Sequence, residues 1–132
     1  MIVVDASALL ELLLSTAAGR AVGERIFDPS ESLHAPELVD LEVAQVLRRY
    51  ERSRVLGATR AGEALRDFEA LPLERYSHRL LLARAWELRA NLTLYDAAYV
   101  ALAELLDAPL LTCDPTLARA PHGAQIELVG RA

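Results

Sequence analysis

The 132-residue sequence contains no lysine, because all 14 of its basic residues are arginine. This absence excludes three classes of enzyme that depend on a lysine: P-loop nucleotidases, protein kinases and Schiff-base enzymes. The net charge is −5, so the chain has no overall attraction for nucleic acid. A polyanionic substrate would need local arginines or a bound cation to hold it.

Cysteine, histidine and long apolar runs are also scarce. The single cysteine, Cys113, excludes an internal disulfide and fits a reducing cytoplasm. The three histidines, His34, His78 and His122, are scattered and lack the spacing of a zinc site. No stretch approaches the roughly 20 apolar residues of a membrane span, and the start MIVVDASALLELLL lacks the basic residues of a secretory signal. We therefore expect a cytoplasmic protein that binds no membrane.

What the sequence does contain is an alternation of short apolar runs and longer amphipathic stretches. The apolar fraction of 53% is typical of a packed globule, and the length suits a single domain over residues 1–132. The expected strands are Ile2–Val4, Ser32–Ala35, Leu73–Tyr76, Pro109–Thr112 and Ile126–Val129. The expected helices are Ala8–Leu14, Arg20–Phe27, Glu37–Arg54, Thr59–Ala70, His78–Ala90 and Leu94–Leu106, with Pro36 near the start of the third and Thr59 as a cap. This pattern favours an α/β fold around a mainly parallel sheet of four to five strands.

Acidic residues recur where this fold would gather them. Asp5 follows the first strand in VVDAS, and Asp114 follows the fourth in LLTCDPT. The carboxyl ends of parallel strands share one edge of the sheet, and the connecting helices begin at that edge. Glu42 is expected in the second turn of one such helix and Asp96 in the first turn of another. The sequence therefore predicts four carboxylates at one edge of the sheet.

The helix that carries Asp96 is apolar almost all round, as LYDAAYVALAELL shows, and this predicts a buried helix. A charge in such a helix must be paired, neutralised or bound to a metal. Tyr95 and Tyr99 in the same helix are expected to be packing residues. Trp86, on the preceding amphipathic stretch, is expected in the core.

Mutual repulsion of the carboxylates favours the binding of a divalent cation. Two carboxylates about 4 Å apart repel by roughly 4 kcal/mol at an effective dielectric constant of 20, against a net domain stability of roughly 5–15 kcal/mol. Protonation relieves part of this repulsion, and a divalent cation relieves it at neutral pH. All-oxygen ligands suit Mg²⁺ or Mn²⁺, and such sites commonly serve phosphoryl transfer.

Each acidic residue also has a simpler explanation. Asp5 and Asp114 are good helix caps, Glu42 resembles an ordinary helix glutamate, and Asp96 suits the positive end of a helix dipole. Only their joint placement at one edge favours a metal site over these four separate roles.

Two further pairs of residues are candidates for supporting roles. Ser7 and Thr112 lie near the two strand aspartates and are expected either to orient a ligand or water or to serve the turn and strand. Arg48 and Arg49, in LRRYERSR, are expected either to contact phosphates or to form a solvated helix end that complements the helix dipole.

Taken together, IVVDASALLELL, APELVDLEVAQVLRR and LTLYDAAYVALAELLDAPLLTCDPTLA resemble the PIN-domain nucleases, and within them the VapC toxins of toxin–antitoxin pairs. The resemblance covers essentially the whole chain and implies a three-layer α/β/α sandwich. It also implies a Mg²⁺-dependent ribonuclease, with Mn²⁺ as a substitute, that hydrolyses RNA phosphodiester bonds with one or two metals. Asp5, Glu42, Asp96 and Asp114 would form its acidic metal site.

The resemblance further implies partners: a second copy in a homodimer, a VapB-type antitoxin that occludes the site, and DNA only indirectly through the antitoxin. A haloacid-dehalogenase-like phosphatase fits less well, because Ser7 replaces the second aspartate of its D-x-D motif and its lysine is absent. A response-regulator receiver would need a lysine and an acidic pair beside Asp5. The remaining alternatives are a catalytically silent PIN-like binding module and another metal-dependent phosphoesterase.

Overall fold

A computed structural model describes residues 1–130 of the chain, which fold around a five-stranded sheet. Every pair of neighbouring strands in this sheet is parallel, and the strand order is β3-β2-β1-β4-β5. The strands are β1 (Ile2–Val4), β2 (Leu33–Pro36), β3 (Leu73–Tyr76), β4 (Leu110–Thr112) and β5 (Ile126–Leu128). The predicted α/β fold with a parallel sheet is confirmed.

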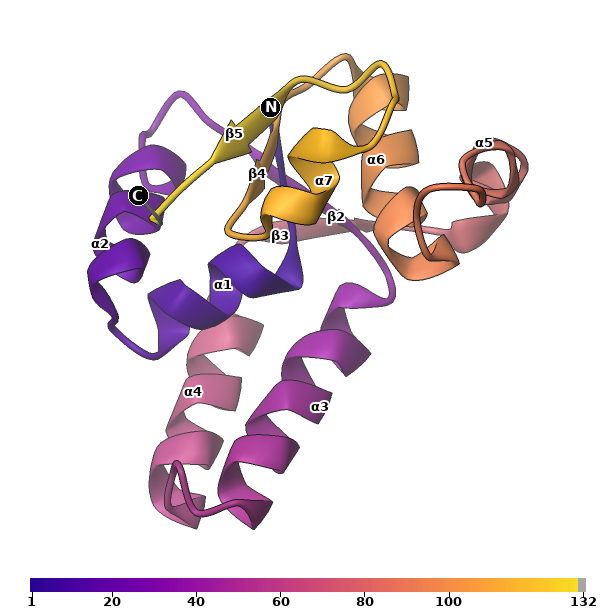
Figure 1. The fold of residues 1–132 in the computed structure, drawn as a ribbon. Coiled ribbons are helices and arrows are strands. Elements are labelled where there is room, and N and C mark those ends of the chain that lie inside the picture. The colour runs from indigo at the N-terminus through magenta and orange to yellow at the C-terminus, as the bar shows by residue number, and fades with distance from the viewer. Residues whose placement is uncertain (131–132) are drawn as a thin grey trace.

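Helices cover both faces of the sheet. They are α1 (Ala6–Leu13), α2 (Ala17–Ile26), α3 (Val39–Arg52), α4 (Ala58–Ala70), α5 (Leu82–Glu87), α6 (Leu94–Leu106) and α7 (Pro115–Arg119). Figure 1 shows α1 and α2 on one side of the sheet, α5 and α6 on the other, and α3 with α4 as a hairpin that projects below it. Helix α1 contacts α2, α3 and α4, whereas α6 packs on β1, β2 and β4. Right-handed crossovers require this division, because the chain reverses its direction across the sheet after β3.

The central strands and α6 form the core. Every residue of β1 and β4 is buried, and so is every residue from Ala97 to Ala103 in α6, as its apolar sequence predicts. Burial of each large aliphatic side chain contributes roughly 1.5–3 kcal/mol to stability. The residues that directly follow β1 and β4 therefore stand on the most tightly packed part of the molecule. Among residues 1–130, no helix has both the length and the apolar character that crossing a bilayer would require.

Some predicted boundaries are wrong. Pro36 is the last residue of β2 rather than the start of a helix, and α3 begins at Val39. The pairing between β2 and β1 ends at His34, so the missing N–H of Pro36 breaks no bond with β1. Gly57, and not Thr59, is the N-cap of α4.

The segment predicted as one helix over His78–Ala90 is instead a 3₁₀ turn, η1 (His78–Leu80), followed by the short α5. Trp86 in α5 is 57% exposed and so is not a core residue. Its ring lies beneath the guanidinium of Arg89, with 4.3 Å between the guanidinium carbon and the ring centroid. Helix α7 was not predicted, because its five residues are too few to show a helical period.

Candidate functional site

Asp5 lies at the carboxyl end of β1 and is 5% exposed. Its Oδ1 accepts hydrogen bonds from the backbone N–H of Ala8 (3.0 Å) and from Ser7 Oγ (2.7 Å), and its Oδ2 accepts one from Thr112 Oγ1 (2.5 Å). The bond from Ala8 makes Asp5 the N-cap of α1. Capping occupies Oδ1 only, so the cap role and a ligand role for Oδ2 are compatible.

Ser7 and Thr112 join the first strand to the fourth. The backbone N–H of Cys113 donates to Ser7 Oγ (3.0 Å), and that of Asp114 donates to Thr112 Oγ1 (2.9 Å). Each hydroxyl thus accepts a hydrogen bond from a backbone N–H of the β4–α7 connection and donates a hydrogen bond to the carboxylate of Asp5. The two hydroxyl oxygens also lie 3.3 Å apart. Both were expected near the strand aspartates; the structure adds that they fix Asp5 and the start of α7 to each other.

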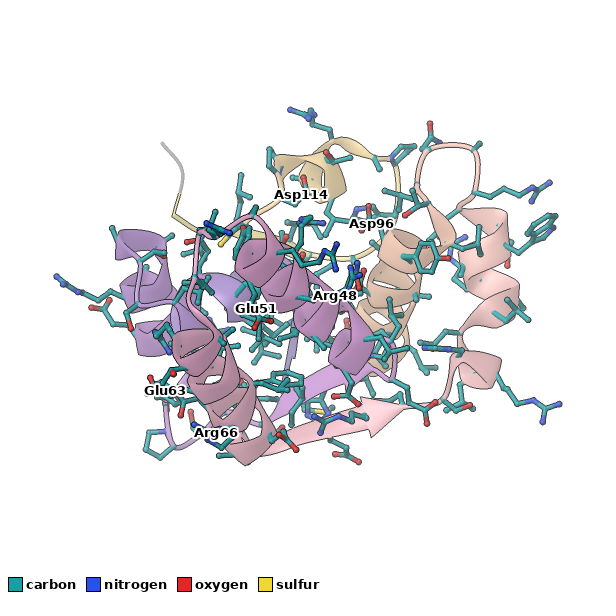
Figure 2. The ribbon with its side chains drawn as sticks, turned by 90° about the horizontal axis from the view of Figure 1, so that it is seen from below. Arg48, Glu51, Glu63, Arg66, Asp96 and Asp114 are labelled. Carbon is teal, nitrogen blue, oxygen red and sulfur yellow. The ribbon has the colours of Figure 1, made fainter. Side chains whose placement is uncertain are left out.

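Asp114 and Asp96 stand at the starts of two neighbouring helices. Asp114 is the N-cap of α7 and accepts from the backbone N–H of Thr116 (2.9 Å). Asp96 lies in the first turn of α6, where Thr93 is the N-cap, and is half-buried. Figure 2, which views the molecule from the side of α3 and α4, shows these two aspartates on the adjacent helices α7 and α6.

Glu42 reaches the same region from α3. It lies in the first turn of that helix, one turn earlier than expected, because the helix begins at Val39. Its Oε1 accepts a hydrogen bond from the hydroxyl of Tyr99 (2.6 Å), which is 2% exposed. The sequence interpretation missed this role of Tyr99. One signal could have indicated it: a tyrosine in a buried helix needs a partner for its hydroxyl, and Tyr99 lies one turn from Asp96 on the same helix face.

The charges of these side chains act on one another. Burial raises the pKa of Asp5, and the charge of Asp114 raises it further, against the hydrogen bonds from Thr112, Ala8 and Ser7. Burial also raises the pKa of Glu42, with added contributions from the charges of Asp96 and Asp5. The pKa of Asp96 is raised by burial and then by the charge of Asp114. Each of the four carboxylates is thus within electrostatic reach of two of the other three.

No arginine or histidine in residues 1–130 is hydrogen-bonded to or ion-paired with any of these four carboxylates. No basic side chain among the described residues therefore neutralises their repulsion. All the groups that meet here are oxygen donors, which suits a hard divalent cation. As the side chains stand, no three acidic, histidine or cysteine side chains in this part of the chain are close enough together to enclose a metal ion.

Two cavities border Glu42, and the first of them also borders Asp114, whereas Asp5 and Asp96 line neither. The first, of about 370 Å³, is lined by Ala6, Ser7, Leu10, Glu11, Glu42, Val46, Arg49, Tyr50, Cys113, Asp114 and Pro115. The second, of about 640 Å³, is lined by Glu37, Leu38, Leu41, Glu42, Gln45, Val46, Arg49, His78 and Tyr95. Glu42 and Arg49 line both cavities. They lie seven residues apart on α3, which is almost two full turns, so their side chains share one face of the helix. Arg48 lines neither of these cavities, and Tyr95, expected to pack, is 67% exposed.

Comparison with known proteins shows which family the chain belongs to. The PIN domain family matches residues 2–123. Ribonuclease VapC12 of Mycobacterium tuberculosis is 42% identical over 130 residues, which are 98% of this chain and 99% of that protein. The chain is a PIN-domain protein of the VapC family.

Solved structures agree with this PIN-domain assignment. PAE2754 from Pyrobaculum aerophilum is 26% identical and superposes with a TM-score of 0.70 over 95% of this chain and 82% of that one. VapBC2 from Rickettsia felis, bound to a DNA fragment from its promoter, is 14% identical, with a TM-score of 0.74 over 98% of this chain and 100% of that one. At that identity the second likeness concerns the fold alone.

Proposed function

We propose that this VapC-family protein is the toxin of a VapBC-type toxin–antitoxin pair and acts as a Mg²⁺-dependent endoribonuclease that hydrolyses RNA phosphodiester bonds. The observation that carries the proposal is the set of four carboxylates near the carboxyl ends of β1 and β4 and the starts of α3 and α6, each of which interacts electrostatically with two of the other three. The 42% identity to a protein named as a ribonuclease supports the choice of RNA as substrate.

Asp5, Glu42, Asp96 and Asp114 are the residues that would hold the cation, Mg²⁺ or in its place Mn²⁺. Asp5 would contribute a single oxygen, because Oδ1 already accepts two hydrogen bonds and only Oδ2 keeps a free lone pair. Bound there, the cation would supply an activated water and stabilise the charge of the phosphate and the leaving oxygen.

The rest of the chain's contribution is orientation and charge. Ser7 and Thr112 hold the Asp5 carboxylate against rotation by a hydrogen bond on each oxygen. Of the two arginines predicted to contact phosphates, Arg49 lines both cavities beside Glu42, about 10.5 Å further along the helix axis. We therefore assign a phosphate contact to Arg49, and Arg48 fits the solvated helix end.

The partners that follow from this function are RNA, a VapB-type antitoxin and a second copy of the chain. The solved VapBC2 structure has a similar fold and contains the pair together with promoter DNA, which supports an antitoxin partner and an association of the pair with DNA. In our proposal the antitoxin reads the DNA and the toxin touches it only indirectly. A net charge of −5 agrees with this division. We also propose that residues 1–132 form one domain and act in the cytoplasm.

RNA cleavage tests the enzymatic proposal. Purified protein with Mg²⁺ should cleave RNA, and both EDTA and the substitution Asp96→Asn should abolish cleavage. Equal cleavage by wild type and variant, with and without EDTA, would mean that a contaminant is responsible. A wild-type protein that binds its antitoxin but cleaves nothing would support the silent binding module instead.

A further inference from the structure

The hydroxyl of Tyr99 lies where the starts of three helices meet. This hydroxyl donates to Glu42 Oε1 at 2.6 Å, and the backbone N–H of Ala6 lies close to it. Ala6 directly follows Asp5, and Tyr99 follows Asp96 by one turn of α6. A single phenol thus connects the start of α1, the first turn of α6 and the first turn of α3.

This junction matters because Glu42 differs from the other three carboxylates in its support. Asp5 and Asp114 cap helices that directly follow the central strands β1 and β4, and Asp96 lies on α6, which packs on the central strands. Glu42 is instead carried by the α3–α4 hairpin, which projects from the sheet (Figure 1). A glutamate side chain has three rotatable bonds, and the charges of Asp96 and Asp5 repel its carboxylate. Without an anchor, these charges would favour conformations that turn it away from the other acids.

Tyr99 supplies such an anchor. Its ring is packed in the core at 2% exposure, so the position of its hydroxyl is fixed. A hydrogen bond to an ionised acceptor is roughly twice as strong as one between neutral groups. Glu42 Oε2 has no hydrogen-bond partner in residues 1–130, so the bond at Oε1 leaves Oε2 available for a cation.

We propose that Tyr99 is a positioning residue: its hydroxyl holds Glu42 in the orientation that allows it to share a divalent cation with Asp5, Asp96 and Asp114. The inference rests on the proposed metal site and names a residue that touches neither the cation nor RNA. Groups that orient metal ligands in this way typically change metal affinity by 10–100-fold when they are removed.

Calorimetric titration with Mn²⁺, in the absence of RNA, tests the inference on the full chain. Tyr99→Phe keeps the ring and removes only the hydroxyl, so the Kd for Mn²⁺ should rise by about 10–100-fold. The matched control is Tyr76→Phe, which also removes a hydrogen-bonded hydroxyl, here one on the outer strand β3 that lies 2.7 Å from Nδ1 of His34 and bonds none of the four carboxylates. That control should bind Mn²⁺ with the wild-type Kd.

A double-variant comparison separates positioning through Glu42 from a general loss of structure. If Tyr99 acts through Glu42, Glu42→Gln with Tyr99→Phe should bind Mn²⁺ no more weakly than Glu42→Gln alone. A wild-type Kd in Tyr99→Phe, or losses that add in the double variant, would overturn the inference.

Glu42→Asp provides a test that leaves the buried tyrosine intact. The shorter side chain keeps its charge but withdraws from the phenol, so its Mn²⁺ affinity should also fall, and a wild-type Kd would contradict the inference. A wild-type Kd in Glu42→Gln has a different meaning: the metal site itself would then be wrongly assigned, and the role of Tyr99 would fall with it.

Discussion

At the scale of single residues, the acidic edge is held together by hydroxyl groups rather than by opposite charges. Ser7 and Thr112 bond Asp5, and Tyr99 bonds Glu42. A hydroxyl can orient a carboxylate and leave its charge in place, whereas an arginine would neutralise that charge. The carboxylates therefore keep the negative charge that attracts a cation while losing the freedom to turn away from it.

The hydroxyl of Thr112 should contribute far more to the free energy of unfolding than its methyl group does. Thr112→Val has nearly the same shape but leaves the backbone N–H of Asp114 unpaired and takes a donor from Asp5, in a residue with 0% exposure. Urea unfolding should show a loss of about 1–3 kcal/mol in the free energy of unfolding. Thr112→Ser retains the hydroxyl and should lose clearly less; equal losses would show that packing rather than hydrogen bonding matters.

The pH dependence of the metal-free protein should reflect the raised pKa values. Asp5, Glu42 and Asp96 have higher pKa values in the folded protein than their ordinary values of 3.8, 4.5 and 3.8. The folded state therefore binds protons more tightly, so these groups lower stability as the pH rises from about those ordinary values through the raised ones.

Urea unfolding in EDTA between about pH 4 and pH 7 measures this effect. The stability of the wild type should fall, relative to that of Asp96→Asn, as the pH rises, because the asparagine side chain of the variant cannot ionise. A wild type that gains stability relative to Asp96→Asn with rising pH would contradict the assigned direction.

Saturating Mn²⁺ should raise the stability of the wild type at pH 7 and not that of Asp5→Asn.

At the scale of elements, the close packing of α1 on α2 fixes the helix that begins beside Asp5. Gly19, in the first turn of α2, lies against the backbone of α1: a Cβ there would overlap the carbonyl oxygen of Glu11 and would meet Cα of Leu12 at 2.9 Å. Neither atom belongs to a flexible side-chain end, so the two helices would have to move apart.

Gly19→Ala should therefore lower the free energy of unfolding by about 1–3 kcal/mol. Gly62 in α4 is the matched control, because a Cβ there would meet only Arg66 Nη1, at 3.5 Å. Gly62→Ala should instead raise stability by about 0.5–1 kcal/mol through its better helix propensity. Both values come from urea unfolding, and destabilisation by both substitutions would contradict the account.

The sequence predicts the elements better than their ends or their contacts. Helix α6 has the predicted bounds because its apolar character is continuous. Pro36 was misplaced because its position depends on where pairing with β1 stops, which is a tertiary fact. The shared edge followed from strand and helix direction. Tyr99, the partner of Glu42, and Thr112, one of the partners of Asp5, lie 57 and 107 residues away in the chain, and no local pattern connects them.

At the scale of the whole molecule, the proposed function requires an acidic protein to bind an acidic polymer. With a net charge of −5, long-range attraction does not bring RNA to the site, so the cation and the nearest arginine become more important. Arg49 lines both cavities beside Glu42, and Arg48 lines neither. The difference between these adjacent arginines is therefore a sensitive test of where the RNA lies.

Arg49→Ala should weaken RNA binding and reduce the slope of log K against log salt concentration by about 0.7–1, the value for one lost phosphate contact. Arg48→Ala should leave that slope unchanged. Fluorescence anisotropy with a labelled single-stranded RNA, on protein made inactive by Asp96→Asn, measures both slopes. Equal changes in the two variants would point to a diffuse charge effect instead of a defined contact.

The most direct test of the account is a calorimetric Mn²⁺ titration of the wild type and of the four variants Asp5→Asn, Glu42→Gln, Asp96→Asn and Asp114→Asn. Asp107→Asn is the control, because Asp107 ends α6 in a left-handed conformation that asparagine also tolerates. Each of the four substitutions should weaken Mn²⁺ binding, and the control should bind Mn²⁺ with the wild-type affinity. Wild-type affinity in any one of the four would remove that residue from the site, and wild-type affinity in all of them would show that no cation binds at this edge.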